Sequence, residues 1–496
     1  MRPGHGHRVS SSTDTHQPDG LDRGFFGQPR PLANLFGVEM WERFSFYGMQ
    51  GILLIYLYYS TAQGGLGIDE ATATGIVGAY GGAVYLATIL GAWLADRVIG
   101  AERTLFYAAV VVMLGHIGLA LIPGIAGVGV GLCLIALGSG GVKANATSLV
   151  GSLYAEGDER RDAGFSLFYM GINIGAFVGP LLTGWLQENK GFHWGFGAAA
   201  VGMFLGLVQY SIGRKRLPDD TRVVPHPLQP HERTRYVVLL VAAVVVVAVL
   251  ALTGVLNAGN LSDWVVAITI VAAIGYFVLL LTSRAVSAVE RSRVWSFVPM
   301  FVTNAVFWSL YQQQFTVVTV YSDKRLDRSF GDWTMPVSWV QSINPIFIIA
   351  LAPVFALVWT RLGPRQPSSP VKFGIGTTLM GVAFLLFLPM PAGDHAVSVV
   401  ALAGVLLVFT LAELFISPVG LSLSTKLAPA TYHTQMVALY FLSVALGTAM
   451  SGRLAAYYDP DDETGYFLLI GVVAIVVGLL MIAANRPIRR LMAGVH

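Results

Sequence analysis

The sequence contains few charged residues and almost no cysteine. Of its 496 residues, 12% are charged and 55% are hydrophobic, whereas soluble globular proteins carry about 25% charged residues. This shortage of charge argues against a soluble domain and against intrinsic disorder. The single cysteine, Cys133, excludes an intrachain disulfide. A formal net charge of only +3 argues against a nucleic-acid partner.

The N-terminal region lacks the apolar core of a secretory signal peptide. Residues 1–31 are rich in Gly, Pro, Ser, Thr and His, so we expect a disordered cytoplasmic tail there. Its histidines His5, His7 and His16 are potential metal ligands, but nothing fixes their geometry. We expect neither a metal nor a cofactor. A second cytoplasmic tail is expected at 486–496.

Long apolar runs dominate the rest of the chain. Each run is long enough for a membrane-spanning helix, which needs about 20 residues. Because the runs are continuous and do not alternate with polar residues, helices are favoured over barrel strands. The sequence therefore predicts an all-α membrane protein with about 14 spans. The runs cover roughly residues 34–58, 72–95, 104–123, 125–150, 163–186, 195–213, 234–256, 261–283, 294–320, 336–360, 371–391, 396–423, 433–456 and 464–485.

Lysine and arginine are distributed unevenly between the two sides of the predicted bundle. With the N-terminus inside, 24 of those outside the spans lie in cytoplasmic segments and 5 lie in outer loops. The positive-inside rule then places both termini in the cytoplasm, with an even number of spans. We expect a multi-pass protein embedded in the lipid bilayer of the cell (inner) membrane. The five outer residues are Lys190, Lys324, Arg325, Arg328 and Arg453.

A basic, proline-containing segment at 214–233 divides the spans into two sets. The next two spans consist mainly of Val, Ala, Leu and Ile, and their only acid is Asp263. Such helices offer nothing to a polar substrate, so we expect a peripheral, lipid-facing hairpin within residues 214–290. The remaining spans are expected to form two six-helix bundles, at 32–213 and 291–485, which is a common plan for transporters.

Five strongly charged residues fall well inside the spans: Glu39, Glu42, Arg43, Lys143 and Glu413. Each would cost at least about 2.5–3.5 kcal/mol if it faced lipid, so they must face a wet cavity or one another. The spacing of the first three places them on one helix face. An ion pair that only braces the bundle is one interpretation. Two acids with one base, however, leave an acid that can titrate, as a proton-coupled carrier requires.

The two halves of the chain offer opposite charges to a cavity between them. Arg43 and Lys143 come from the first half, and Glu413 comes from the second. A zwitterion with separated ends, such as an amino acid or a short peptide, complements this arrangement, whereas a sugar does not. Four aromatic residues are candidates for lining this cavity, with simple packing as the alternative: Tyr47, Tyr80, Trp308 and Tyr440.

Four motifs carry a family resemblance, in order along the chain. Glu39-Met-Trp-Glu42-Arg43 resembles the ExxER motif of the proton-dependent oligopeptide transporters (POT/PTR), a family of the major facilitator superfamily. The segment from Phe168 to Gly175 resembles their FYxxINxG signature. The segments 91–100 and 417–429 resemble a loop of the superfamily and the tenth-span region. The resemblance implies the major facilitator fold, with an extra hairpin between the halves as in bacterial members.

The resemblance also implies a role for individual residues in a symporter of di- and tripeptides and protons. Glu39, Glu42, Arg43, Lys143 and Glu413 would couple transport to protons. Arg43 and Lys143 would hold the peptide carboxylate. The remaining candidate substrate-binding residues are Glu413 and Asn173 for the amino terminus, Tyr47 and Tyr80 for hydrogen bonds, and Trp308, Gln312, Ser417 and Tyr440.

The sequence departs from the family pattern at several positions. Gln312 stands where many members carry a seventh-span acid, and a glutamine cannot titrate. Phe46 and Tyr440 replace a common tyrosine and tryptophan, and Ala144 replaces a usual proline. A weakly coupled peptide carrier is therefore an alternative, as is a carrier of amino acids, nitrate or drug-like molecules.

Three other classes are less compatible with the sequence. An enzyme is disfavoured because the spans contain no HExxH, GxSxG or paired-aspartate metal motif. A channel is disfavoured because no ring of repeated polar residues is apparent. A receptor that binds peptide without transporting it would show no counterflow. We expect a monomer.

Overall fold

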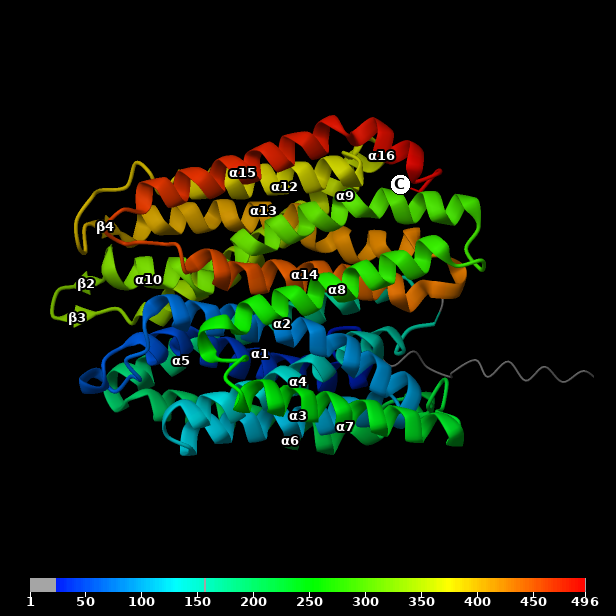
Figure 1. Ribbon diagram of the computed structural model, residues 1–496, viewed down its shortest axis with the longest axis horizontal. Helices are drawn as coiled ribbons and strands as arrows, with labels where there is room; N and C mark the ends of the chain where they lie inside the picture. Colours follow the sequence, from blue (N-terminus) through cyan, green and yellow to red (C-terminus); the bar gives the residue numbers. More distant parts are fainter. Residues whose placement is uncertain (1–23, 156–157, 496) are drawn as a thin grey trace, which may run out of the picture.

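The structure is a computed structural model that describes residues 24–155 and 158–495. Most of the predicted N-terminal tail, including His5, His7 and His16, lies outside these residues. Within them, no group of three or more His, Cys, Asp or Glu side chains is arranged to hold a metal ion. The described chain is almost entirely helical, and its long helices run side by side (Figure 1).

Six helices form the first bundle. Each of them ends where its apolar run is followed by glycine, proline or polar residues. A glycine with positive φ follows α2 and its short π-helical extension, and another follows α5, at Gly100 and Gly191. Such backbone favours glycine and stops a helix. The six helices are α1 (Arg30–Tyr58), α2 (Glu70–Leu94), α3 (Ala101–Leu121), α4 (Gly124–Gly151), α5 (Arg161–Lys190) and α6 (Phe192–Gly213).

The second bundle contains a broken span and four short strands. Its first span is α9 (Ala288–Tyr311), a 3₁₀ turn (Gln312–Phe315) and α10 (Val317–Lys324). The other helices are α11 (Ile343–Leu362), α12 (Ser369–Leu385), α13 (Val399–Leu427), α14 (His433–Ala455), α15 (Glu463–Ala483) and α16 (Asn485–Leu491). Strand β1 (Leu326–Asp327) pairs in parallel with β4 (Val397–Ser398), and β2 (Ser329–Phe330) pairs antiparallel with β3 (Trp333–Thr334). All four strands lie at one end of the bundle, which we call the strand end; the opposite end, where the C-terminus lies, is the terminus end (Figure 1).

Two further helices, α7 (Pro230–Leu252) and α8 (Leu261–Thr282), follow the first bundle. Not one residue of α7 is buried, so its valines and leucines are available to lipid. Helix α8 packs against α2 and α14, one helix from each bundle, and Asp263 at its start pairs with Arg453 at 3.1 Å. These helices are the predicted lipid-facing insertion.

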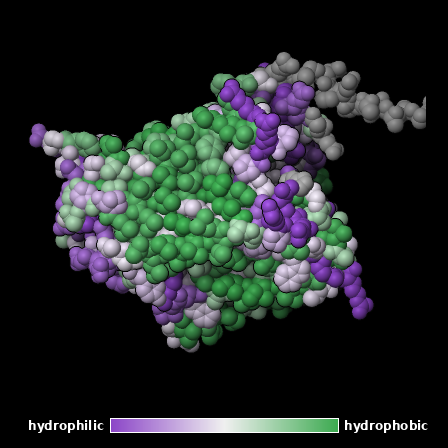
Figure 2. All heavy atoms as spheres, turned by 90° about the horizontal axis from the view of Figure 1, so that it is seen from above, coloured by the Kyte–Doolittle hydropathy of each residue, from purple (hydrophilic) through white to green (hydrophobic). Residues whose placement is uncertain are grey.

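Twelve of the described helices are long and apolar enough to cross a membrane. Two more lie alongside them: α1, which carries four charged residues over its 29 residues, and α12, which has 17 residues. Together they account for the predicted number of spans. The surface shows an apolar band with hydrophilic residues gathered at opposite ends (Figure 2), as a membrane-embedded bundle requires. The predicted all-α fold is confirmed.

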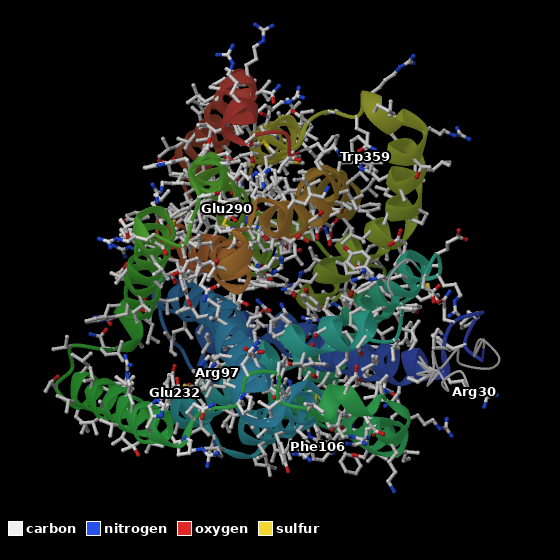
Figure 3. The ribbon with its side chains drawn as sticks, turned by 90° about the vertical axis from the view of Figure 1, so that its right-hand side faces the viewer. Arg30, Arg97, Phe106, Glu232, Glu290 and Trp359 are labelled. Carbon is white, nitrogen blue, oxygen red and sulfur yellow. The ribbon has the colours of Figure 1, made fainter. Side chains whose placement is uncertain are left out.

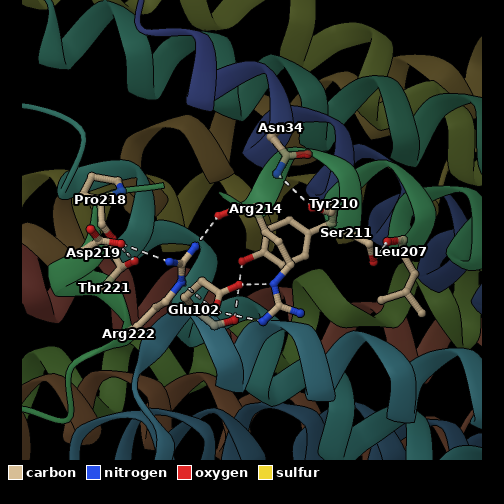
Figure 4. Close-up of polar contacts among 10 residues, drawn as sticks. All are labelled: Asn34, Glu102, Leu207, Tyr210, Ser211, Arg214, Pro218, Asp219, Thr221 and Arg222. Atoms are coloured by element: carbon tan, nitrogen blue, oxygen red, sulfur yellow. Dashed lines mark hydrogen bonds and ion pairs between the residues drawn. The ribbon is translucent and has the colours of Figure 1, made fainter. Parts of the chain in front are cut away.

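A buried carboxylate fastens the segment that links the first bundle to α7. Glu102 is fully buried, and the linker supplies both of its cationic partners (Figure 4). Arg214 donates to it from Nη2 at 3.0 Å and lies 4.0 Å from the ring of Phe106, while Arg222 Nε lies 3.7 Å from Oε2. Further along, Arg97 pairs with Glu232 at 3.1 Å (Figure 3). The linker and the start of α7 are therefore tied to the junction of α2 and α3.

We predict that Glu102→Gln lowers the apparent melting temperature of the purified protein. Losing charge-assisted hydrogen bonds at a buried carboxylate costs about 1.5–3 kcal/mol each. Thermal unfolding in detergent measures the effect. Arg103→Gln is the matched control, because Arg103 is the exposed next residue. Equal melting temperatures for the two variants would show that Glu102 does not fasten the linker.

Candidate functional site

The charged residues of α1 form one buried cluster. Arg43 Nη2 donates to Glu39 Oε1 at 2.7 Å, and Arg43 Nε lies 3.2 Å from Glu42 Oε2. All three side chains are at most 5% exposed. One turn of helix therefore brings two carboxylates onto one guanidinium, so the cluster carries one more acid than base.

Helix α4 contributes to this cluster through a hydroxyl and not through its lysine. Ser139 Oγ donates to Glu42 Oε1 at 2.7 Å. Lys143, one turn further, places Nζ 4.3 Å from the centre of the Tyr85 ring and 5.5 Å from that of Phe46. Among the described residues no ion pair joins Lys143 to a carboxylate. The lysine is thus held by aromatic faces, close to the cluster but separate from it.

A small polar cavity of about 120 Å³ lies between the two bundles. Five of the predicted site residues line it: Tyr47 from α1, Asn173 from α5, Trp308 from α9, Gln312 from the 3₁₀ turn and Glu413 from α13. Ligand pockets usually measure about 300–1,000 Å³. A cavity this small cannot hold a dipeptide without widening, so the two bundles are drawn together around it.

Glu413 is anchored within the second bundle. Tyr311 Oη donates to Glu413 Oε2 at 2.6 Å and lies 3.3 Å from Asn344 Oδ1. Nearby, Gln312 Nε2 donates to Thr448 Oγ1 at 3.3 Å. The sequence analysis missed Tyr311 and Asn344, which line the cavity together with Glu413. An amide side chain inside an apolar span costs free energy unless it has a hydrogen-bond partner. The glutamines at 312–314 and Asn344 therefore indicate a polar site in the sequence itself.

Five of the predicted substrate-binding residues do not line the small cavity. Arg43 lies in the buried cluster described above. The Tyr80 ring stacks on Phe46 with centroids 6.0 Å apart, and its hydroxyl is buried without a hydrogen-bond partner in the described part of the chain. Tyr440 is buried against Gly420. Ser417 lies on α13 one turn beyond Glu413, and Lys143 lines a different hollow.

That second hollow opens at the terminus end and measures about 790 Å³. Lys143 and Thr147 of α4 line one side of it, and Gln435 and Phe441 of α14 line the other. It therefore lies between the bundles, and Lys143 stands between it and the α1 cluster.

The strand end is closed by direct bonds between the bundles. Asp323 of α10 accepts hydrogen bonds from Tyr58 at 2.6 Å and Tyr59 at 2.7 Å. Ser342 Oγ donates to the carbonyl of Phe177 at 2.8 Å. Ser338 and Trp339 likewise donate to carbonyls of α5. At the same end, a Cβ on Gly78 of α2 would lie 2.5 Å from the Cα of Gly452 of α14, so these helices meet backbone to backbone. One end of the interface is shut while the other is hollow.

Comparison with known proteins identifies this arrangement. A family model described as the POT family matches residues 102–467. The chain belongs to the POT family. This confirms the predicted family, and with it the major facilitator-type fold and a transporter in place of an enzyme.

Relatives align with the POT chain over nearly its whole length. A protein of Bacillus subtilis (strain 168), "Uncharacterized transporter YclF", is 43% identical and covers 95% of this chain and 97% of its own. A "Di-/tripeptide transporter" of Lactococcus lactis subsp. cremoris is 38% identical and covers 96% of this chain and 99% of its own. A crystal structure of peptide transporter POT in complex with sulfate matches with a TM-score of 0.91 and 44% identity, over 95% of this chain and 98% of that chain.

We predict that Asp323→Ala opens the strand end of this POT transporter. The change removes the acceptor shared by Tyr58, Tyr59 and Arg328, and charge-assisted bonds are worth about 1.5–3 kcal/mol each. Spin labels at Gln63 and Asp332, in a Cys133→Ser background, report the separation of the two bundles at this end. We expect a longer-distance population to grow at least about tenfold.

Asp327→Ala is the matched control, because Asp327 is an exposed acid on β1 of the same end. The same distance distribution in both variants would show that the Asp323 bonds do not hold the strand end closed.

Proposed function

We propose that the chain is a proton-coupled symporter that imports di- and tripeptides by alternating access. The observation that carries this proposal is the pairing of a buried carboxylate–arginine cluster in one bundle with Glu413 across a polar cavity in the other. Membership of the POT family and the naming of relatives as di-/tripeptide transporters support it. We further propose that it works as a monomer.

The two ends of the peptide are proposed to meet charged side chains of opposite bundles. Arg43 and Lys143 of the first bundle would receive the carboxylate. Glu413 of the second bundle would receive the amino group, assisted by Asn173 of α5 in the first bundle. Tyr47 lies on the cavity wall between these sides and can donate a hydrogen bond to the peptide. In the described conformation the Arg43 guanidinium is bonded to a carboxylate of its own helix. Peptide binding therefore requires Glu39 or Glu42 to release it, which protonation of a carboxylate would bring about.

In the proposed orientation the spans cross the cell (inner) membrane and both termini lie in the cytoplasm. The strand end then faces outward and is shut, and the terminus end, with its hollow of about 790 Å³, faces the cytoplasm. An inward proton flow would drive accumulation, since moving one charge is worth about 2.3 kcal/mol per 100 mV. Deprotonation on the inside would restore the bonds of Arg43 and expel the peptide.

A weakly coupled peptide carrier is the second candidate. Gln312 favours it, because this amide bonds to Thr448 and supplies no titratable group at the cavity wall. In that case Glu39, Glu42 and Glu413 would be the carboxylates left to carry the proton.

Uptake of labelled dialanine into proteoliposomes tests the proposal. Uptake that rises with an inward proton gradient is the expected result. Exchange that ignores the gradient would favour the weakly coupled carrier. Absence of both would contradict peptide transport and point to another substrate.

We predict that Lys143→Ala and Glu42→Gln each abolish gradient-driven uptake of dialanine. The first change removes a cation from the side of the site that would hold the peptide carboxylate. The second replaces the Glu42 carboxylate with an uncharged amide that cannot titrate. Lys190→Ala is the control for the loss of a lysine, because Lys190 is exposed at the end of α5. Full gradient-driven uptake by either test variant would contradict this mechanism.

We also predict that Glu413→Gln weakens recognition of the free amino terminus. The lost charge-assisted bond is worth about 1.5–3 kcal/mol, or about tenfold or more in affinity. Competition by dialanine and by N-acetyl-dialanine measures this. In the wild-type protein dialanine should compete better, and in the variant the preference should shrink. An unchanged preference would remove Glu413 from the amino-terminal site.

A further inference from the structure

Glu413 is the only charged residue among the described side chains that line the small polar cavity. It is 7% exposed, and within the described chain no ion pair joins it to a cation. In the helices packed against α13, namely α9, α11, α12 and α14, charged residues stand only near the helix ends. A buried carboxylate without a cation depends on hydrogen-bond donors for its charged form. The donors to Glu413 therefore influence when it carries a proton.

The other titratable groups near Glu413 are tyrosines. Tyr440 of α14 interacts with it electrostatically. Three tyrosines of the first bundle line the same cavity: Tyr47 of α1, Tyr85 of α2 and Tyr169 of α5. Of all these tyrosines and Tyr311 of α9, it is Tyr311 that donates a hydrogen bond to the carboxylate.

The Tyr311 hydroxyl has two acceptors within reach but only one hydrogen to donate. Its Oη lies 2.6 Å from Glu413 Oε2 and 3.3 Å from Asn344 Oδ1. The shorter distance is typical of an O–H group that donates to a charged carboxylate. Because a carbonyl oxygen can only accept, the contact with Asn344 has no hydrogen while Tyr311 donates to Glu413. The described arrangement is therefore the one that suits an ionised Glu413.

The orientation of the Asn344 amide is fixed by α13. Its Nδ2 donates to Thr410 Oγ1 at 3.0 Å, and Thr410 Oγ1 donates in turn to the carbonyl of Leu406 at 2.9 Å. Since the single hydroxyl hydrogen of Thr410 is already used, Thr410 can only accept from the amide. The NH₂ group of Asn344 therefore faces Thr410, and its carbonyl oxygen is left for Tyr311.

The Tyr311 ring is held by three other aromatic rings. It stacks on Phe307 with centroids 5.8 Å apart, and its centroid lies 5.2 Å from that of Trp308 and 6.4 Å from that of Phe409. The side chain is buried at the end of α9. Within this packing the ring keeps its place, so the hydroxyl hydrogen is the part that can turn.

We propose that Tyr311 is a positioning residue that switches its hydrogen bond between Glu413 and Asn344 as Glu413 loses or gains a proton. With Glu413 ionised, Tyr311 donates to the carboxylate. When a proton from water binds Glu413, the new carboxyl O–H donates to Tyr311 Oη, and the Tyr311 hydrogen turns to Asn344 Oδ1. The proton stays on Glu413, Tyr311 stays a neutral phenol, and each donor has an acceptor in both states. The switch rests on the proposed proton-coupled function, for which it supplies a buried carboxylate that is satisfied with and without its proton.

Infrared difference spectroscopy of the purified full-length protein tests the switch. The spectrum at high pH is subtracted from the spectrum at low pH, and protein made with ring-deuterated tyrosine identifies the tyrosine bands without any substitution. We expect a carboxyl C=O band that disappears in Glu413→Gln. We also expect a tyrosine C–O band that disappears both in Glu413→Gln and in Tyr311→Phe. A tyrosine band that remains in either variant, or the absence of any tyrosine band, would overturn the proposal.

Tyr321→Phe is the matched control, because Tyr321 is a fully buried tyrosine of the same bundle whose hydroxyl has no hydrogen-bond partner in the described part of the chain. Its loss should leave the tyrosine band in place. Thr410→Val keeps the test valid if Tyr311→Phe fails to fold. This change removes the acceptor that orients Asn344, so the tyrosine band should shift or weaken while the carboxyl band of Glu413 remains. An unchanged tyrosine band in Thr410→Val would also overturn the proposal.

Transport of dialanine separates a failure of the switch from a failure of the proposed function. In Tyr311→Phe we expect gradient-driven uptake to fall about tenfold, because Glu413 loses a donor to the ionised form that it must adopt when its proton leaves. Exchange of dialanine without a gradient should persist, since Glu413 itself is kept. Equal losses of uptake and exchange would show a merely structural role and overturn the proposal. Absence of uptake by the wild-type protein would contradict the proposed function, whereas the infrared bands would still decide whether Tyr311 switches.

Discussion

The cost of a charge inside a bilayer is the constraint on which the rest of this structure depends. Glu39, Glu42 and Arg43 lie in the middle of α1, and facing lipid would cost each of them at least about 2.5–3.5 kcal/mol. They are instead buried on one another and on Ser139 of α4. This cluster turns one face of α1 away from lipid and toward the interior. A second bundle with its own carboxylate, Glu413, then completes a polar interface that neither half could form alone.

The same interface is asymmetric along its length. At the strand end the bundles touch through Asp323 and through backbone contact at Gly78 and Gly452. At the terminus end a hollow separates them. Because the closed end is held by side-chain hydrogen bonds between the bundles, these bonds can break and reform without unpacking either bundle. This is the property that a carrier working by alternating access requires.

The sequence was sufficient for the fold, but it did not determine how the candidate site residues are connected. Apolar run lengths predicted the spans, and helical spacing predicted that Glu39, Glu42 and Arg43 share a face. Spacing within one helix does not tell which neighbouring helix will meet that face. The hydrogen bond from Tyr311 to Glu413 and the separation of Lys143 from the carboxylates depend on packing between helices, so they became visible only in the structure. The 3₁₀ turn at Gln312–Phe315 was hidden for the same reason.

The wall of the small cavity explains how this chain can work with a glutamine at position 312. Gln312, Asn173 and Asn344 make the cavity polar, and none of them can change charge. Among the described residues, the carboxylates on and behind its walls are then confined to two places, the α1 cluster in one bundle and Glu413 in the other. In the proposed mechanism, no ion pair at position 312 connects these places. The peptide itself, with one charged end toward each bundle, becomes the link through which proton binding in one bundle affects the other bundle.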